Sequence, residues 1–507
     1  MKTPTPIPFS RRLDFVTAQD LTPIFRRLQR LPHGVWLDSA SDRDYDRGRY
    51  SFLTADPVAW CAADTDSPDP WSVLQEWCRK LGHAAIGDAA IGDASSDETS
   101  SDSEALPPFC GGVVGLLGYE SAWWLEPVLR HDAEAMGWDR NLPGMAIGLY
   151  DWTIAVDHHR DAVWLLSTGL DENFRLDVDR ANARAEQVIA WMKTEWEPID
   201  PDEAGNSKSN TSNTISSTFT DAGYAAGVSE IIDRICRGDS FQVNLAQTLS
   251  APATCRPEEL YARLRAINPA PYACYFDAGE YQVISSSPEG FLQVRTDAKG
   301  QRHVVTRPIK GTVARTGEAD EDERLGALLL ASEKDRAENI MIVDLMRNDL
   351  SRVCTDESVE VTGLCELERY QRVQHLVSTV RGVLGPDASV CDLLAACFPG
   401  GSITGAPKVE AMRTIAKLER RPRGPYCGSL GYISLSGAAD FNILIRTVTQ
   451  RSGAAANAEG KETVGNPSSV WEFPVGGGIT ARSDPEGETQ ETWVKAASLL
   501  EAIGAAR

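Results

Sequence analysis

A lysine stands between a proline-stiffened approach and a glycine in the stretch Thr306-Arg307-Pro308-Ile309-Lys310-Gly311-Thr312. Pro308 fixes φ before the lysine, and Gly311 allows the backbone to turn sharply or to approach a ligand closely. An ammonium held in this way can bind a phosphate or a carboxylate, and it can act as a nucleophile where burial lowers its pKa. Taken alone the stretch is typical of a surface turn, so the rest of the chain has to decide between these interpretations.

Two predicted helices carry carboxylates at helical spacing. The first spans about 321–352 and contains Glu338, and the last spans about 486–502 with Glu488, Glu491 and Lys495 along one stripe. Each stripe alone is typical of a solvated helix face. If the two helices face one cleft, Glu338 and Glu491 form a carboxylate pair suited to Mg²⁺, which prefers hard oxygen ligands and takes few protein carboxylates beside an anionic substrate.

Glycine-rich stretches provide candidate anion sites. Residues 399–406, Pro-Gly-Gly-Ser-Ile-Thr-Gly-Ala, are predicted to form a turn that opens a helix, and Gly476-Gly477-Gly478-Ile479 is predicted to form a second turn. Backbone N–H groups in such turns bind anions. Neither stretch matches a Walker A or dinucleotide fingerprint, so phosphate is not favoured over carboxylate. His375, in an apolar strand, is by itself typical of a structural histidine.

The composition narrows the class of protein. The 507 residues include 50 Lys and Arg against 73 Asp and Glu, a formal net charge of −23. This charge speaks against a nucleic-acid partner, which requires a basic face, and means that an anionic substrate has to be met by local cations or a metal ion. With 42% hydrophobic and 24% charged residues the chain has ample material for a globular core.

The cysteines and the apolar runs indicate where the protein functions. Eleven cysteines are scattered without a Cys-x-x-Cys pair, and the seven histidines show no metal-ligand spacing. We therefore expect free thiols in a reducing, cytoplasmic compartment. The N-terminus has no apolar core of a signal peptide, and no apolar run approaches the roughly 18 residues of a membrane span, so no membrane association is expected.

Two polar stretches divide the chain. Residues 84–106 contain a tandem Ala-Ile-Gly-Asp repeat followed by a Ser- and acid-rich run, which predicts a disordered surface insertion. Residues 197–218 are polar and of low complexity, which predicts a linker loop between an N-terminal region, 1–196, and a catalytic domain, 219–507. Apolar spacing predicts strands over 35–40, 49–53, 241–247 and 283–286, and helices over 71–81 and up to Gly238.

Many ordered motifs between about 224 and 503 together resemble one family, the chorismate-utilising enzymes. The matching stretches are 241–247, Ser287-Pro288-Glu289, 307–312, 333–349, 375–378, 399–408, 427–432, 445–447, 476–479 and 488–495. The N-terminal region matches more weakly, through 37–40 and 48–52. The resemblance implies an α+β fold of layered antiparallel sheets flanked by helices, as in anthranilate synthase component I, with the N-terminal region wrapped into it.

The resemblance also implies roles for individual residues. Lys310 would be the nucleophile, Glu289 the general acid and His375 a contact near the ring of the substrate. Glu338 and Glu491 would bind Mg²⁺. Glu333 and Glu488 would support these two metal ligands without binding the ion themselves. Substrate contacts are implied for Gly311, Thr312, Thr404, Tyr426, Arg446, Gly476, Gly477, Gly478 and Lys495. The family further implies tryptophan in a pocket near Ser39, although Asp38 departs from the glutamate-serine pattern of the ortho enzymes and speaks against regulation by it.

Two positions predict the reaction within the family. Water-adding members carry a lysine base where this chain has Gln242, and anthranilate synthases carry alanine where it has Lys310. At position 310 the chain thus resembles the aminodeoxychorismate synthases, which aminate chorismate in the synthesis of para-aminobenzoate and folate. No cysteine has the setting of a glutamine-hydrolysing nucleophile, so a glutamine amidotransferase subunit is expected to supply the ammonia. The alternatives are anthranilate synthesis and a non-catalytic chorismate- or tryptophan-binding scaffold.

Overall fold

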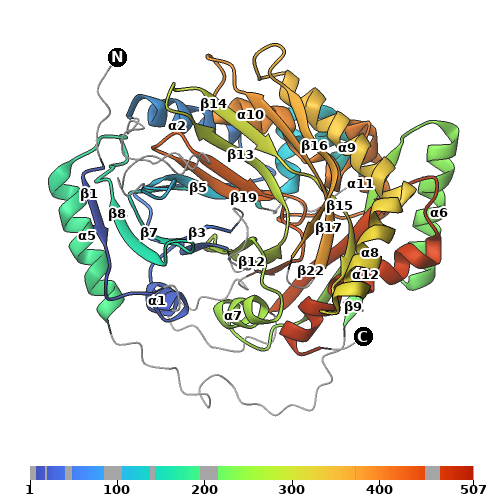
Figure 1. Ribbon diagram of the computed structural model, residues 1–507, viewed down its shortest axis with the longest axis horizontal. Coiled ribbons are helices and arrows are strands. Elements are labelled where there is room, and N and C mark those ends of the chain that lie inside the picture. Colours follow the sequence, from blue (N-terminus) through green and yellow to red (C-terminus); the bar gives the residue numbers. More distant parts are fainter. Residues whose placement is uncertain are drawn as a thin grey trace.

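Two large antiparallel sheets form the centre of the molecule, with helices around them (Figure 1). The computed structural model describes residues 7–17, 20–39, 48–84, 106–136, 143–194, 215–370, 373–451 and 469–505. The predicted disordered insertion and linker therefore lie mainly outside the described residues. At their margins, Ala84 ends a helix and Ser216–Ser217 form a short strand.

Within the described residues the first sheet has 12 strands in the order β1-β8-β7-β3-β2-β11-β12-β21-β22-β10-β18, with β9 beside β10. Its strands are β1 Phe9–Arg12, β2 Val35–Asp38, β3 Tyr50–Thr54, β7 Trp152–Asp157, β8 Ala162–Ser167, β9 Ser216–Ser217, β10 Gln242–Pro252, β11 Tyr272–Asp277, β12 Tyr281–Ser287, β18 Gly405–Ala406, β21 Thr447–Arg451 and β22 Val470–Ile479.

The second sheet has 10 strands in the same part of the chain, in the order β15-β17-β14-β13-β20-β19-β5-β6-β4, with β16 beside β17. Its strands are β4 Ala59–Asp64, β5 Gly112–Leu117, β6 Pro143–Tyr150, β13 Gly290–Thr296, β14 Arg302–Thr306, β15 Ile309–Ala314, β16 Glu360–Arg369, β17 Val373–Val383, β19 Ser429–Ser434 and β20 Ala439–Asn442. Together with the helices this arrangement is the α+β fold that was expected.

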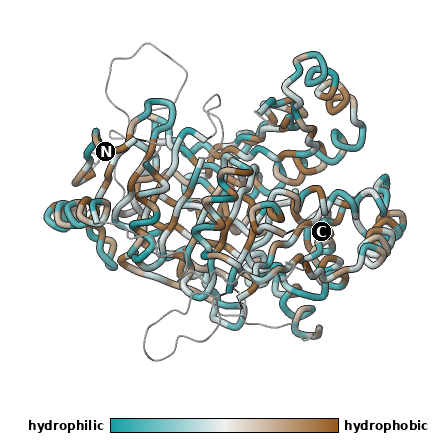
Figure 2. The backbone as a smooth tube through the Cα atoms, turned by 90° about the horizontal axis from the view of Figure 1, so that it is seen from below, coloured by the Kyte–Doolittle hydropathy of each residue, from teal (hydrophilic) through white to brown (hydrophobic). Residues whose placement is uncertain are grey.

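Helices enclose the two sheets. They are α1 Leu21–Leu28, α2 Trp71–Ala84, α3 Ala122–Leu125, α4 Pro127–Ala135, α5 Val178–Lys193, α6 Asp221–Arg237, α7 Pro257–Ile267, α8 Ala319–Ala331, α9 Glu333–Ser351, α10 Val390–Cys397, α11 Lys408–Glu419 and α12 Pro485–Ile503, with 3-10 turns η3 Tyr119–Ser121 and η4 Gly401–Ile403. None of the helices in the described ranges is long and apolar enough to cross a membrane. Hydrophobic segments run through the central strands, and hydrophilic segments follow many of the outer helices and turns (Figure 2).

Strands from both halves of the chain pair within each sheet. In the first sheet β2 pairs with β11, and in the second β5 pairs with β19, all antiparallel. Backbone hydrogen bonds thus join residues before position 151 directly to residues after 270. The N-terminal region thus completes both sheets together with the C-terminal half.

The predicted helix over 321–352 is two helices, α8 and α9, which is a correction to the prediction. They meet at Ser332, whose hydroxyl accepts a hydrogen bond from the backbone N–H of Asp335 and caps α9. An N-cap serine satisfies a backbone donor that otherwise has no partner at a helix start. The predicted stop of the earlier helix is confirmed, because Gly238 ends α6 with a left-handed backbone (φ 88°).

Candidate active site

Lys310 lies in β15 and points toward α9 and η4. Its Nζ is 3.9 Å from Glu338 Oε2 and donates a hydrogen bond of 3.3 Å to the carbonyl oxygen of Ser402. The strand bulges after Lys310, where Gly311 adopts φ 74°, a region that favours glycine. The bulge places the lysine between a carboxylate and a backbone carbonyl.

The three glycines at 476–478 lie within β22 and do not form the predicted turn. They pair with β10, where a Cβ on Gly476 would come within 2.2 Å of the Leu245 carbonyl oxygen. A Cβ on Gly477 would lie 3.3 Å from Lys495 Nζ, and one on Gly478 would lie 3.3 Å from Lys310 Nζ. The absence of side chains here therefore lets both lysines approach the strand surface.

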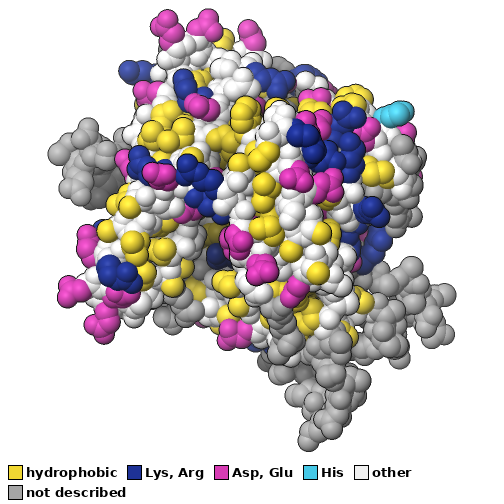
Figure 3. All heavy atoms as spheres, turned by 90° about the vertical axis from the view of Figure 1, so that its right-hand side faces the viewer, with side chains coloured by type: hydrophobic (Ala, Val, Ile, Leu, Met, Phe, Trp, Pro, Cys, Tyr) yellow, Lys and Arg dark blue, Asp and Glu magenta, His cyan; other side chains and the backbone are white. Residues whose placement is uncertain are grey.

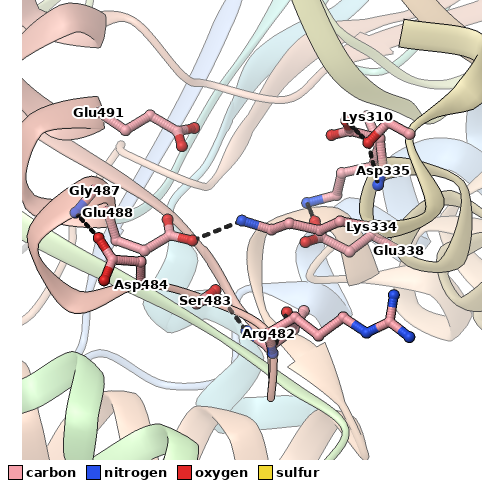
Figure 4. A network of polar contacts seen from close by, with 12 residues as sticks. Lys310, Lys334, Asp335, Glu338, Arg482, Ser483, Asp484, Gly487, Glu488 and Glu491 are labelled. Atoms are coloured by element: carbon pink, nitrogen blue, oxygen red, sulfur yellow. Dashed lines mark hydrogen bonds and ion pairs between the residues drawn. The ribbon is translucent and has the colours of Figure 1, made fainter. Parts of the chain in front are cut away.

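Helix α12 supplies the second group of charges (Figure 4). Lys495 Nζ is 2.8 Å from Glu491 Oε1 and donates 2.9 Å to the Gly476 carbonyl oxygen. Burial raises the pKa of Glu491, but the charges of Lys495, Lys334 and Lys310 outweigh it and the pKa is lowered. Glu491 is thus held as an anion beside β22.

Lys334 connects α9 with α12 and was missed by the sequence analysis. Its Nζ donates 2.8 Å to the buried Glu488 Oε1, spanning the space between the two helices (Figure 4). The sequence places Lys334 one helical turn before Glu338, and this spacing indicates that the two side chains lie on the same face of the helix. Glu333, by contrast, is exposed and pairs with Arg482 at 3.0 Å, so it lies on the surface and does not support Glu338 or Glu491 as predicted.

Glu338 is a buried carboxylate with one oxygen, Oε1, that has no hydrogen-bond partner among the described residues. Burial raises its pKa, which the charges of Lys310 and Lys334 partly offset. A buried carboxylate oxygen without a hydrogen-bond partner is suited to coordinate a cation. No group of three or more Asp, Glu, His or Cys that could hold a metal is found in the described ranges. Glu338 extends from α9 and Glu491 from α12, and both offer the hard oxygen atoms that Mg²⁺ prefers (Figure 4).

Glu289 follows β12 and is buried beside this cluster. Burial raises its pKa, and the Lys310 charge pulls the pKa back in part. A buried carboxyl with a raised pKa keeps its proton to higher pH, which suits a general acid. Its backbone is fixed, because its carbonyl accepts a hydrogen bond from the Ile443 N–H at 3.0 Å.

Gln242, at the start of β10, belongs to the site although the sequence analysis used it only to exclude a lysine base. It is fully buried, and neither amide atom has a hydrogen-bond partner in the part of the chain that the structure describes. A Cβ on Gly478 would lie 2.6 Å from its Nε2 and 3.3 Å from Lys310 Nζ, so the amide sits close to the lysine. Buried amides are normally paired, which makes this one a candidate ligand contact.

The remaining predicted residues lie around the cluster. His375 accepts or donates a 2.9 Å hydrogen bond with the Thr312 hydroxyl through Nδ1, so these two residues contact each other. The Thr404 hydroxyl donates 2.9 Å to the Gly400 carbonyl. Within the described residues none of Thr404, Tyr426 and Arg446 forms a hydrogen bond or ion pair with Lys310, Glu338 or Glu491. Arg446 is half-buried with φ 50°, and burial lowers its pKa.

A cavity of about 700 Å³ lies near the N-terminal strands, and none of Lys310, Glu338 and Glu491 lines it. Its wall includes Asp38, Ser39, Arg295 and Asp440. Asp38 is already engaged, because it accepts hydrogen bonds from Arg265 Nε at 2.6 Å and from the Tyr261 hydroxyl at 3.0 Å.

A family model described as chorismate binding enzyme matches residues 46–501, and the chain belongs to this family. Among curated proteins it is 35% identical to aminodeoxychorismate synthase component 1 of Escherichia coli strain K12, over 94% of this chain and 95% of that protein. It is also 37% identical to anthranilate synthase component 1 of Thermus thermophilus, over 78% of each chain.

Solved structures agree on the fold. Anthranilate synthase component I from Streptococcus pneumoniae aligns with a TM-score of 0.67 and 27% identity, covering 91% of this chain and 94% of that one. The menaquinone-specific isochorismate synthase from Escherichia coli aligns with a TM-score of 0.65 and 19% identity, covering 99% and 96%. At 19% identity, the similarity to the isochorismate synthase supports a shared fold only.

Proposed function

We propose that this chain is a chorismate-aminating enzyme that makes 4-amino-4-deoxychorismate, using ammonia supplied by a glutamine amidotransferase subunit. The observation that carries the proposal is Lys310 itself, held in the site where the resemblance places alanine in the anthranilate synthases. The relative from Escherichia coli that carries the aminodeoxychorismate synthase name covers nearly the whole chain and supports the same assignment. Relatives named component 1 support a second subunit.

The side chains suit a double displacement. Lys310 Nζ, once neutral, adds its lone pair to C2 of chorismate while both conjugated ring double bonds shift and the C4 hydroxyl leaves. Glu289 delivers its proton to that hydroxyl, which departs as water. Ammonia then adds at C4 and the electrons return to expel Lys310 from C2, so the amine arrives with retention.

Charged groups around the lysine support binding of an anionic substrate. Arg446, a half-buried cation without a carboxylate partner in the described ranges, suits a substrate carboxylate. Mg²⁺ held by Glu338 and Glu491 would neutralise the ring carboxylate of bound chorismate. The Gly477 and Gly478 surface gives the substrate room beside Lys495 and Lys310.

The deciding experiment is mass spectrometry of the products formed from chorismate, Mg²⁺ and ammonium by the purified chain at mildly alkaline pH. Aminodeoxychorismate without pyruvate is expected, and Lys310→Ala should lower kcat at least about 100-fold because the covalent route is lost. Lys299→Ala, in an exposed turn, is the matched control and should behave as wild type. Anthranilate with pyruvate would overturn the assignment, and no turnover would favour a scaffold.

Tryptophan is a second proposed ligand, with the cavity near Ser39 as its place. Asp38 lies in the cavity wall, but its bonds to Arg265 and Tyr261 leave it poorly placed to pair with an amino group. The cavity volume is the feature that supports a ligand here, and the engaged Asp38 speaks against feedback inhibition, so we propose a bound tryptophan that does not inhibit. Thermal unfolding with added tryptophan should show a rise in Tm by mass action while kcat and KM stay unchanged.

A further inference from the structure

A buried arginine, Arg423, contacts three segments that surround the site. Its side chain is 3% exposed, yet it forms no contact with Lys310. Nε and Nη2 donate to the two oxygens of Glu419 at 3.0 and 2.6 Å. Nη1 donates 3.0 Å to the Ile403 carbonyl, and Nη2 donates to the Asn244 carbonyl and side-chain oxygen at 3.0 and 3.2 Å.

The acceptors of Arg423 adjoin the proposed site residues. Ile403 lies in η4 between Ser402, whose carbonyl accepts from Lys310, and Thr404. Asn244 lies in β10 two positions after Gln242, and its N–H donates 2.8 Å to the Thr404 carbonyl. The Arg423 guanidinium therefore connects η4 to β10 next to the residue, Ser402, that binds Lys310.

The N-terminal half holds the same arginine by its backbone. Glu120, which is 1% exposed, accepts the N–H of Arg423 at 2.7 Å and that of Gly424 at 2.9 Å. The Tyr119 N–H donates 2.8 Å to the Gly424 carbonyl, and the Arg423 guanidinium lies 4.8 Å from the Tyr119 ring centre. This backbone leads directly to Tyr426, a proposed substrate contact.

Stability alone does not explain such a cluster. Two charges taken out of water lose their hydration, and apolar residues of similar volume often stabilise a core as well or better. The guanidinium instead offers a rigid fork of donors that fixes several acceptors at once, which a lysine cannot do. A precise arrangement of η4, β10 and the segment before Tyr426 is what this geometry provides.

We propose that Arg423 is a positioning residue of the active site, which sets η4 and β10 so that the Ser402 carbonyl, Thr404 and Gln242 face Lys310, with Glu120 fixing the arginine from the N-terminal half. The proposal rests on the proposed chorismate-consuming function but not on which product forms. Neither Arg423 nor Glu120 contacts substrate in this assignment. They act through the segments they hold.

The test compares Arg423→Lys with Arg184→Lys. Arg184 is a partly buried arginine that binds two carboxylates, Asp56 at 2.7 Å and Asp151 at 3.1 Å, and it lies on α5, at the opposite end of the molecule from α11 (Figure 1). Chorismate consumption gives kcat and KM, thermal unfolding gives Tm, and hydrogen–deuterium exchange reports on the peptide over 399–407. Glu120→Gln, which leaves one acceptor for two backbone N–H groups, is the second variant.

Arg423→Lys is expected to lower kcat/KM at least about 10-fold relative to Arg184→Lys, because small misplacements in a site are costly, and to speed exchange over 399–407. Equal kinetics and equal exchange in the two lysine variants would overturn the proposal. If Arg423→Lys does not fold, Glu120→Gln decides, with a several-fold loss of kcat/KM expected and wild-type kinetics contradicting it. If the wild-type chain consumes no chorismate, the proposed function fails and the exchange comparison alone decides the positioning role.

Discussion

The burial of the Glu289 carboxyl predicts how the activity of the enzyme depends on pH. As a general acid it must carry a proton, and burial raises its pKa, so the protonated fraction at neutral pH is larger than for an exposed glutamate. Activity should fall as pH rises through this pKa, because the ionised form cannot protonate the leaving hydroxyl. Glu289→Gln should lower kcat about 10²–10⁴-fold and remove that descending limb from the pH–rate profile. A limb that persists unchanged in the variant would assign it to another group.

The unpaired amide of Gln242 predicts that its removal does not destabilise the fold. Replacing it by methionine removes two buried polar groups that have no partner in the described residues, so Gln242→Met should keep or raise the free energy of unfolding, by about 1 kcal/mol. Gln247 lies on the same strand, but its amide bonds to Thr492 and Ser217, both at 2.6 Å. Gln247→Met should therefore destabilise by about 1–3 kcal/mol. Thermal and denaturant unfolding compare the two, and a large destabilisation by Gln242→Met would show that the amide is paired.

Individual site residues could be predicted from the sequence where a motif carried them. Lys310, Glu338, Glu491 and Lys495 were predicted from their motifs, and the structure brings them around β22. Arg423 could not be found in this way, because its acceptors at 244, 403 and 419 come from three separate elements. Contacts to backbone carbonyls leave no pattern in side-chain spacing.

At the scale of elements, the bulge in β15 gives a prediction. Gly311 has φ 74°, and a Cβ there would lie 2.7 Å from Leu329 Cδ1 and 3.0 Å from Asp335 Cγ. Gly300 has φ 79° with open space around it, so it is the matched control. Gly300→Ala should cost about 1–2 kcal/mol of unfolding free energy from backbone strain alone, and Gly311→Ala should cost more and also lower kcat. Equal stability losses and unchanged kcat would contradict a role for the bulge in aiming Lys310.

The two element errors have physical causes. The break between α8 and α9 follows from Ser332, whose hydroxyl caps the second helix, and the Ser-x-x-Asp spacing is a capping signal within an otherwise continuous helical composition. A run of three glycines such as 476–478 is typical of a turn, because glycine is depleted in strands. Here the close Leu245 carbonyl and the two lysines favour glycine within β22. Such tertiary contacts are not encoded in local propensity.

At the scale of the molecule, the net charge of −23 is not spread evenly over the surface (Figure 3). On the face formed on the side of α6, α11 and α12, acidic, basic and hydrophobic side chains alternate (Figure 3). Basic side chains are therefore present on this face (Figure 3) although the total charge of the protein is strongly negative. The sequence could give the total charge, but its distribution depends on which helices share a face.

The interleaved sheets predict that neither half folds alone. Residues 219–507 without the N-terminal region would leave β11 without β2 and β19 without β5, exposing edges of apolar strands. The fragment alone should therefore aggregate, whereas co-expression of 1–196 with 219–507 should give a soluble complex, because every pairing between the halves can still form. Size-exclusion chromatography and circular dichroism of both samples, beside the intact chain, measure this. A soluble, cooperatively unfolding 219–507 fragment would mean that the N-terminal strands are an addition to a self-sufficient domain.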